Sequence, residues 1–118
     1  MNKTQKIQLI RDSGVIAIMR AQSSHQLIAA ADAIRQGGVR VIEVTMTTPG
    51  ALKVIEEATL RYGDDVLFGA GTVLDAETAR AAILAGAGFI VAPTLSLDVI
   101  ELCRRYNVPV MPGCYTPT

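Results

Sequence analysis

The chain alternates short apolar runs with segments of helical periodicity, and this alternation limits its possible folds more than any other feature. Five runs rich in β-branched residues begin 19 to 27 residues apart. They predict strands over Val15–Met19, Val39–Thr45, Val66–Gly69, Phe89–Ala92 and Val108–Met111. Nearly continuous apolar strands that alternate with helices form parallel sheets covered by helices. The sequence therefore predicts an α/β fold.

The segments between the predicted strands carry the start and stop signals of helices. Side chains that can cap a helix N-terminus stand at Ser23 or Ser24, at Thr48 (with Pro49 in the first turn), at Asp75 and at Ser96. Residues that tolerate a left-handed backbone follow the helical segments at Gly37–Gly38, Gly63, Gly86 and Asn107. A short helix ending near Gly14 is expected before the first strand.

Two α/β architectures fit this pattern. Five βα units suit a doubly wound flavodoxin-like sheet, and they equally suit the first five strands of a (β/α)₈ TIM barrel, which needs about 250 residues. Thr116-Pro117 repeats the helix-start signal of Thr48-Pro49. We therefore expect residues 1–118 to be the N-terminal part of a single barrel, a partial barrel of strands 1–5.

Composition excludes several classes of partner. The 118 residues include 11 Lys and Arg and 11 Asp and Glu, whereas nucleic acids and anionic membranes select a surplus of positive charge. The two cysteines, Cys103 and Cys114, are too few for a disulfide framework and lack metal-ligand spacing. No apolar run has the length of a membrane helix or the form of a signal peptide. We expect a cytoplasmic, reduced protein with no nucleic-acid, membrane or metal partner.

Ligand sites in parallel α/β folds form beyond the carboxyl ends of the strands. The polar or small residues expected there are Arg20, Glu43, Thr45, Thr47, Thr48, Gly71, Thr72, Pro93, Thr94 and Cys114. The chain's lysines, by contrast, lie outside the predicted strands, at Lys3, Lys6 and Lys53. None is therefore placed as an interior amine nucleophile.

Glu43 is the most informative of these residues, because a carboxylate in a buried strand is costly unless it is paired or used. Alternation places Val41, Glu43 and Thr45 on one face of the strand. Glu43 is predicted to be a general base or half of a structural ion pair with Arg20, and the two roles are compatible. Arg20 is either a surface residue or a clamp for a substrate carboxylate or phosphate.

The segment Gly69-Ala70-Gly71-Thr72 lacks the full spacing of a dinucleotide-binding loop. Its glycines instead predict a close approach of the backbone to a small ligand, with Thr72 as a hydrogen-bond donor. The single histidine, His25, falls in the first turn of a predicted helix, where it is expected to be solvated.

Several of these segments together resemble the bacterial 2-keto-3-deoxy-6-phosphogluconate (KDPG) / 4-hydroxy-2-oxoglutarate (KHG) aldolases. The resemblance covers the chain from about residue 7 to its end. It is carried by five blocks in the family's order: Val15-Ile16-Ala17-Ile18-Met19-Arg20, Gly37-Gly38-Val39-Arg40-Val41-Ile42-Glu43-Val44-Thr45, Gly69-Ala70-Gly71-Thr72-Val73-Leu74-Asp75, Ala87-Gly88-Phe89-Ile90-Val91-Ala92-Pro93 and Val110-Met111-Pro112-Gly113.

The resemblance implies a class I aldolase, an aldehyde-lyase of the Entner–Doudoroff type, on a (β/α)₈ barrel that is usually a homotrimer. In such enzymes a lysine forms a Schiff base with the 2-keto group, and cleavage releases pyruvate without a metal or other cofactor. The aldehyde product is glyceraldehyde 3-phosphate or glyoxylate, depending on the substrate. The family's Schiff-base lysine lies on strand 6, beyond the strands predicted here.

The resemblance also assigns roles to single residues. Glu43 resembles the family's acid/base residue. Thr72, which follows Gly71, resembles a residue that contacts the pyruvyl carboxylate. Pro93 resembles part of the pocket wall. Some members bind the carboxylate with an arginine at the position of Thr47. We hypothesise that Arg20, which resembles the strand-1 arginine of part of the family, substitutes for that missing charge.

Two other functions fit the same residues. One is a different barrel enzyme acting on a phosphorylated sugar or keto acid, with Glu43 in another proton-transfer role. The other is a non-catalytic α/β module that binds a small anion.

Overall fold

The chain folds around one parallel sheet, in a computed structural model that describes residues 1–20 and 23–118 (backbone only at residue 24). The strands are β1 (Ala17–Met19), β2 (Val41–Thr45), β3 (Leu67–Gly71), β4 (Ile90–Ala92) and β5 (Val110–Pro112). They lie side by side in chain order, and each neighbouring pair is parallel. This order is that of a (β/α)₈ barrel, because a flavodoxin-like sheet would place the second strand outside the first. The prediction of a partial barrel is confirmed.

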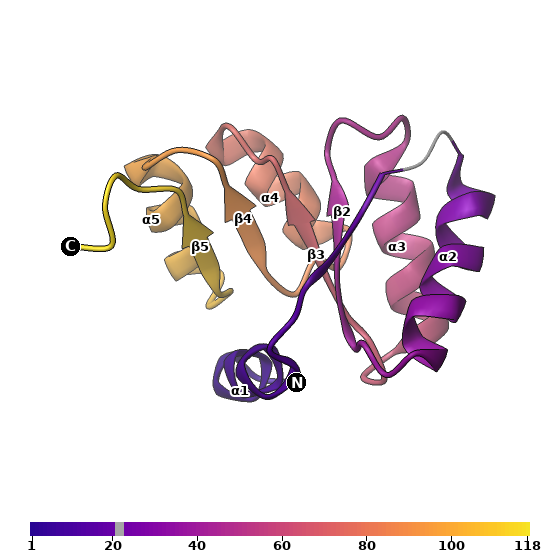
Figure 1. Cartoon of the computed structure of the whole chain (residues 1–118). Helices are drawn as coiled ribbons and strands as arrows, with labels where there is room; N and C mark the ends of the chain where they lie inside the picture. The colour runs from indigo at the N-terminus through magenta and orange to yellow at the C-terminus, as the bar shows by residue number, and fades with distance from the viewer. Residues whose placement is uncertain (21–22) are drawn as a thin grey trace.

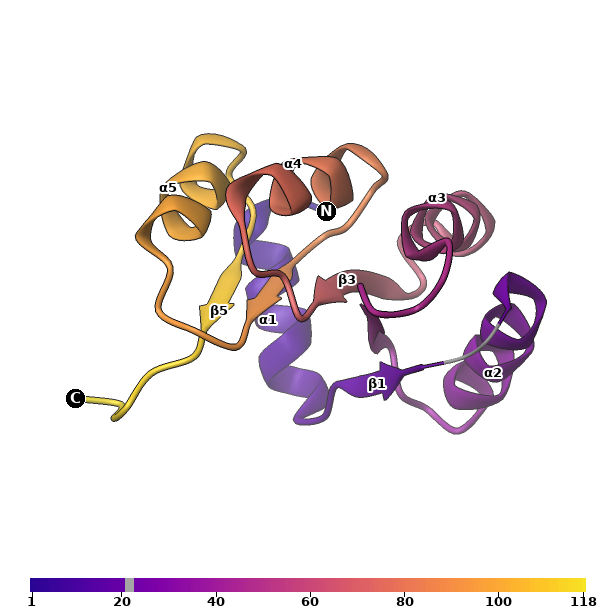
Figure 2. The same ribbon diagram turned by 90° about the horizontal axis from the view of Figure 1, so that it is seen from above.

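Five helices accompany the sheet in the described residues: α1 (Lys3–Ser13), α2 (Ser24–Gln36), α3 (Ala51–Tyr62), α4 (Ala76–Leu84) and α5 (Leu97–Arg105). Helices α2 to α5 follow the outside of the curved sheet, whereas α1 crosses below the amino ends of the strands (Figures 1 and 2). The sheet therefore has an outer face covered by four helices and an inner face covered only by α1. No helix of the described residues is long and apolar enough to cross a membrane.

Three of the predicted helix caps are confirmed. The side chains of Ser23, Asp75 and Ser96 each accept a hydrogen bond from a backbone N–H in the first turn of the following helix. The prediction for α3 is wrong, because this helix begins at Ala51 after a left-handed Gly50. Thr48 instead closes a turn, its N–H donating to the Thr45 carbonyl at 3.0 Å, and this turn delays the helix.

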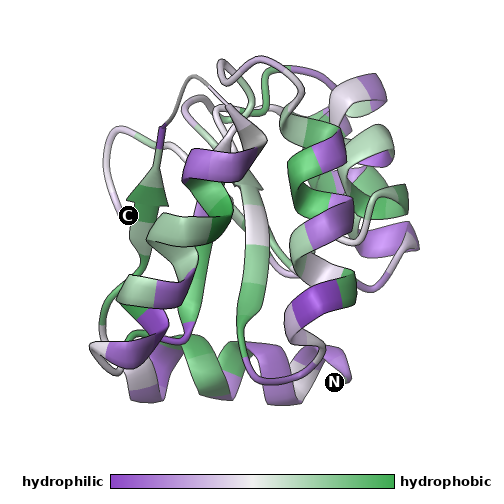
Figure 3. Ribbon diagram, turned by 90° about the vertical axis from the view of Figure 1, so that its right-hand side faces the viewer, coloured by the Kyte–Doolittle hydropathy of each residue, from purple (hydrophilic) through white to green (hydrophobic). Residues whose placement is uncertain are grey.

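The outer face packs against the helices in one apolar core. Ile42 and Val44 of β2 and Ile90 of β4 are completely buried there, against helix residues such as Ile55 and Val99. Along the helices in Figure 3, hydrophobic residues alternate with hydrophilic ones, as expected when one side faces the sheet. Burying each large aliphatic side chain stabilises the fold by about 1.5–3 kcal/mol.

The inner face has a second, smaller apolar cluster at the amino end of the strands. Val41, Leu67 and Phe89 form it, and Leu9 and Ile10 of α1 pack against them. Helix α1 therefore closes the amino end of the inner face. The polar residues of the sheet lie further along the strands, toward their carboxyl ends.

Candidate active site

Glu43 lies on the inner face in the middle of β2, where alternation predicted it. Its partners in register are Ile18 of β1 and Gly69 of β3. Only 6% of the residue is exposed, so its carboxylate is largely removed from water. It forms no hydrogen bond or ion pair with another described residue, and since no fully buried side-chain oxygen among these residues lacks a hydrogen-bond partner, its carboxyl oxygens keep some contact with solvent. The carboxylate is therefore buried yet free to bind a ligand or a proton.

The glycines of β3 make room for this carboxylate. A Cβ atom on Gly71 would overlap the carboxyl group of Glu43, and one on Gly69 would overlap the ring of Phe89. We expected a small ligand to lie close to the backbone at these glycines. The groups that lie there are instead side chains of the same chain. A strand of ordinary residues at these two positions could not hold Glu43 where it is.

Burial raises the pKa of the Glu43 carboxyl above its ordinary value, and the positive charge of Arg20 opposes that shift without cancelling it. Burial dominates because the carboxylate loses water on the inner face and gains no hydrogen bond in return. A carboxyl with a raised pKa exchanges protons more readily near neutral pH, as a general acid or base must.

Arg20 follows the last residue of β1 and is exposed. It influences Glu43 through its charge, but the two side chains form no ion pair within the described part of the chain. The structural ion pair that the sequence left open is therefore wrong, because the guanidinium stays in solvent at the strand end. Its donors remain available to an anion bound above Glu43.

Three threonine hydroxyls meet at the carboxyl end of β2. The Thr45 hydroxyl, 1% exposed, donates to the Met19 carbonyl at 3.4 Å and accepts from the Thr47 hydroxyl at 3.3 Å. It also lies 3.2 Å from the hydroxyl of Thr48. These contacts tie the loop after β2 to the end of β1, directly before Arg20.

Thr72, the first residue after β3, has a left-handed backbone with φ of 55°. That conformation is rare for a β-branched residue and costs on the order of 1–3 kcal/mol. Thr72 and Thr47 line the same 300 Å³ pocket, together with Asp75 at the start of α4. Strain of this kind concentrates at ligand sites, so the geometry supports a binding role for Thr72.

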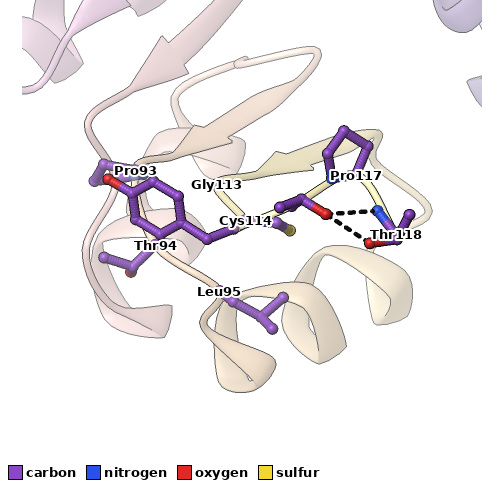
Figure 4. Close-up of a pocket in the computed structure, with 9 residues that line it drawn as sticks. Pro93, Thr94, Leu95, Gly113, Cys114, Pro117 and Thr118 are labelled. Atoms are coloured by element: carbon purple, nitrogen blue, oxygen red, sulfur yellow. Dashed lines mark hydrogen bonds between the residues drawn. The ribbon is translucent and has the colours of Figure 1, made fainter.

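Pro93 lies in a different place from the threonines. It lines an open pocket of 840 Å³ between the segments that follow β4 and β5, with Thr94, Gly113 and Cys114 (Figure 4). Gly113 is required there, because a Cβ atom would overlap the Pro93 carbonyl. The structure thus brings Glu43 and Gly71 together, and Thr47 and Thr72 together, but it leaves Pro93 outside both pairs.

The other chemically reactive side chains lie away from this end of the sheet or outside its pockets. His25 is exposed on α2, as predicted, and Lys53 is exposed on α3, 3.9 Å from Glu57. Cys103 lies on the buried side of α5, and burial raises the pKa of its thiol. The described residues contain no group of three or more His, Cys, Asp or Glu side chains placed to hold a metal ion.

Sequence reasoning missed Phe89 as part of this site. Phe89 was assigned only to a strand, yet its ring lies over Gly69, directly across from Glu43. The available signal was the pair of glycines two residues apart on one face of β3. Two glycines so placed, between strands that carry bulky side chains, indicate that those bulky side chains occupy the space above the glycines.

The fold is a partial α/β barrel with a buried carboxylate on its inner face and hydrogen-bond donors at the carboxyl ends of its strands. The model of the KDPG and KHG aldolase family matches residues 7–118. The chain belongs to this family.

Individual relatives agree with the family match. The chain is 32% identical to the 2-dehydro-3-deoxy-phosphogluconate aldolase of Haemophilus influenzae, over 96% of the chain and 53% of that protein. It is 38% identical to the aldolase of the same name from Treponema pallidum, over 88% and 49%. The chain therefore spans about half the length of the curated relatives it matches.

Solved structures extend the similarity to three dimensions. The KDPG aldolase of Zymomonas mobilis ZM4, solved with 3-phosphoglycerate, matches with a TM-score of 0.82 and 29% identity, over 92% of this chain and 51% of that one. The KDPG aldolase of Legionella pneumophila, solved with pyruvate captured as a covalent carbinolamine, matches with a TM-score of 0.79 and 29% identity. That match covers 84% of this chain and 48% of that one.

Proposed function

We propose that the protein to which these residues belong is a class I aldolase that cleaves KDPG, 4-hydroxy-2-oxoglutarate or both, releasing pyruvate. The observation that carries the proposal is the unpaired, buried Glu43 on the inner face of a chain that belongs to the KDPG and KHG aldolase family. A retro-aldol reaction needs a group that removes the proton from the substrate hydroxyl. Glu43 has the burial and the raised pKa for that task.

The groups around Glu43 suit a keto acid. The Arg20 guanidinium and the hydroxyls of Thr47 and Thr72 are hydrogen-bond donors at the ends of β1, β2 and β3. In this proposal they bind the carboxylate of the substrate, the Thr47 hydroxyl turning to it from Thr45, beside the Glu43 carboxyl that Gly71 accommodates. Pro93 forms part of the wall on the β4 side.

The carbonyl is activated, in this proposal, by a lysine that the family resemblance places on a sixth strand. The inner face of the five strands and the half-length match to the relatives support residues 1–118 being the N-terminal part of a single (β/α)₈ barrel. The captured carbinolamine of the Legionella enzyme supports the same chemistry here. We further propose, from the family resemblance, a cytoplasmic homotrimer.

Borohydride trapping tests the reaction class. The protein encoded by the complete gene is incubated with pyruvate and sodium borohydride, and its intact mass is measured. The lysine amine and the keto group condense with loss of water, and hydride reduces the iminium to a stable amine. We expect one reduced pyruvyl adduct per chain, on a lysine beyond residue 118. Absence of an adduct, or an adduct on Lys53, would overturn the proposal.

A substitution tests the hypothesis that Arg20 binds the carboxylate. In the same protein, Arg20→Ala should raise the KM for the keto acid about tenfold or more, because a charge-assisted hydrogen bond contributes about 1.5–3 kcal/mol. Arg104→Ala, which removes an exposed arginine from α5, serves as the control. An unchanged KM in Arg20→Ala would show that another group binds the carboxylate.

A further inference from the structure

Two side chains from neighbouring strands lean over β3 at successive positions. The Phe89 ring, which comes from the residue directly before β4, occupies the place that a side chain on Gly69 would take. The Glu43 carboxyl, which comes from β2, occupies the corresponding place over Gly71. Gly69 and Gly71 share one face of the strand and lie about 7 Å apart. The ring and the carboxyl group are therefore neighbours on the inner face.

The ring is held firmly in this place. Phe89 is completely buried and packs with Val41 and Leu67, the partners that define the inner apolar cluster. Ile10 of α1 closes the cluster from below. Since this cluster lies on the amino-terminal side of Glu43, water cannot reach the carboxyl group from that direction.

The groups that face Glu43 from the surrounding elements are almost all uncharged. The segment directly after β1 contributes Arg20, the one charge among the described residues that acts on it. Strands β3 and β4 contribute glycines and Phe89, and α1 turns Leu9 and Ile10 toward the inner cluster. The protonation of Glu43 is therefore governed by one arginine on the open side and an apolar wall on the closed side.

We propose that Phe89 is a positioning residue for Glu43: its ring, seated in the gap that Gly69 leaves on β3, excludes water from one side of the carboxyl group and confines it over Gly71. This inference rests on the proposed function for the role of Glu43 in proton transfer. The ring touches no substrate and acts only through the carboxyl group. Its chemical requirement is an apolar side chain as large as the Phe89 ring directly before β4.

Phe89→Leu tests the proposal, with Phe68→Leu as its matched control. Phe68 is 2% exposed and lies on the neighbouring strand, but it faces the opposite side, where its ring lies 5.5 Å from that of Tyr62. Both substitutions remove a buried ring from the same sheet, so both should lower stability. In the complete protein, the Glu43 carboxyl carbon is titrated by ¹³C NMR. We expect Phe89→Leu to lower the pKa of Glu43 and Phe68→Leu to leave it unchanged.

The pH profile of the reaction provides a second readout. We expect the acid limb of kcat to move to lower pH in Phe89→Leu and to stay in place in Phe68→Leu. Phe89→Met, which like leucine is apolar but lacks the ring and has nearly the same volume, should move the limb in the same direction, and it replaces Phe89→Leu in the titration if the latter does not fold. A Glu43 titration that is unchanged in Phe89→Leu, or equally changed in Phe68→Leu, would overturn the proposal. A shifted titration in a protein without aldolase activity would support the positioning role and refute the proposed function.

Discussion

The outer and inner faces of the sheet are built from alternate residues of the same strands, yet the two faces differ in their polarity. On β2, Ile42 and Val44 face the helices and are fully buried among apolar side chains. Val41, Glu43 and Thr45 face inward, and two of these three are polar. All five are equally hidden from solvent, so burial alone does not distinguish the two faces. Polar residues in a strand that is buried on both faces therefore indicate a candidate site, because no solvent-facing surface explains them.

The inner face is itself divided along the strand direction. Its amino end is an apolar cluster beneath which α1 lies, Glu43 and Thr45 lie further along β2, and Arg20 and Thr72 follow the carboxyl ends of β1 and β3. The fold thus keeps the side chains that hold it together apart from those that can meet a ligand. This arrangement is the one expected of barrel enzymes, in which the carboxyl ends of the strands carry the chemistry.

The largest expected effect follows from the inner face. In the complete protein, Glu43→Gln keeps the shape of the side chain but removes its ability to take a proton. We expect kcat for aldol cleavage to fall roughly 10²- to 10⁴-fold, the contribution typical of a general acid or base. Steady-state kinetics measure it, with Glu56→Gln on the exposed side of α3 as the control. Wild-type kcat in Glu43→Gln would remove Glu43 from the mechanism.

The neighbouring residue on the outer face should behave in the opposite way. Ile42→Ala leaves a cavity in a core where Ile42 is completely buried, so we expect a loss of about 2–5 kcal/mol in the free energy of unfolding. Denaturant unfolding measures the loss. The kcat of the folded protein should stay within a few-fold of wild type; a large drop would show that the two faces are coupled.

A smaller effect concerns stability and pH. Because burial raises the pKa of Glu43 in the folded state, the neutral form of this carboxyl favours folding. Its contribution is fully present below the ordinary value of 4.5 and is lost as pH rises through the raised pKa of the folded state. We therefore expect Glu43→Gln to have a higher Tm than wild type at neutral pH and a similar Tm at acid pH. Thermal unfolding across this range checks the sign, and a higher Tm for wild type at neutral pH would contradict it.

The smallest expected effect is a difference in thiol reactivity between the outer core and the open end of the sheet. Cys103 is fully buried and the pKa of its thiol is raised, whereas Cys114 is exposed beside the pocket between β4 and β5. A thiol reagent should label Cys114 rapidly and Cys103 only after denaturation. Peptide mapping after labelling distinguishes the two, and rapid labelling of Cys103 would show that the outer core opens.

Much of the fold was predictable because its signals are local. The strand spacing, the caps Ser23, Asp75 and Ser96, and the inward direction of Glu43 all follow from residues close together in sequence. The start of α3 was not predictable from Thr48-Pro49, because the hydroxyl and N–H of Thr48 bond back to Thr45.

The candidate site was less predictable, because it depends on contacts between strands. Strand β3 extends to Gly71, two residues beyond the predicted end, although glycine has a low preference for strands. The extension is needed because Gly69 and Gly71 receive Phe89 and Glu43. The absence of an ion pair between Arg20 and Glu43 was unpredictable for a similar reason, because a sequence does not show how far a long side chain reaches from a strand end.

The closed amino end of the inner face also determines how protons and ligands can enter and leave the proposed barrel. Because α1 and the apolar cluster close the amino end, the carboxyl end of the described strands is an open route for protons between Glu43 and water, and in the proposed barrel a keto acid would use the same end. A bound ligand would therefore stand between the carboxyl group and the solvent. A proton taken from the substrate would then remain with Glu43 for the lifetime of the complex, and could be returned to the same molecule before it is lost to water.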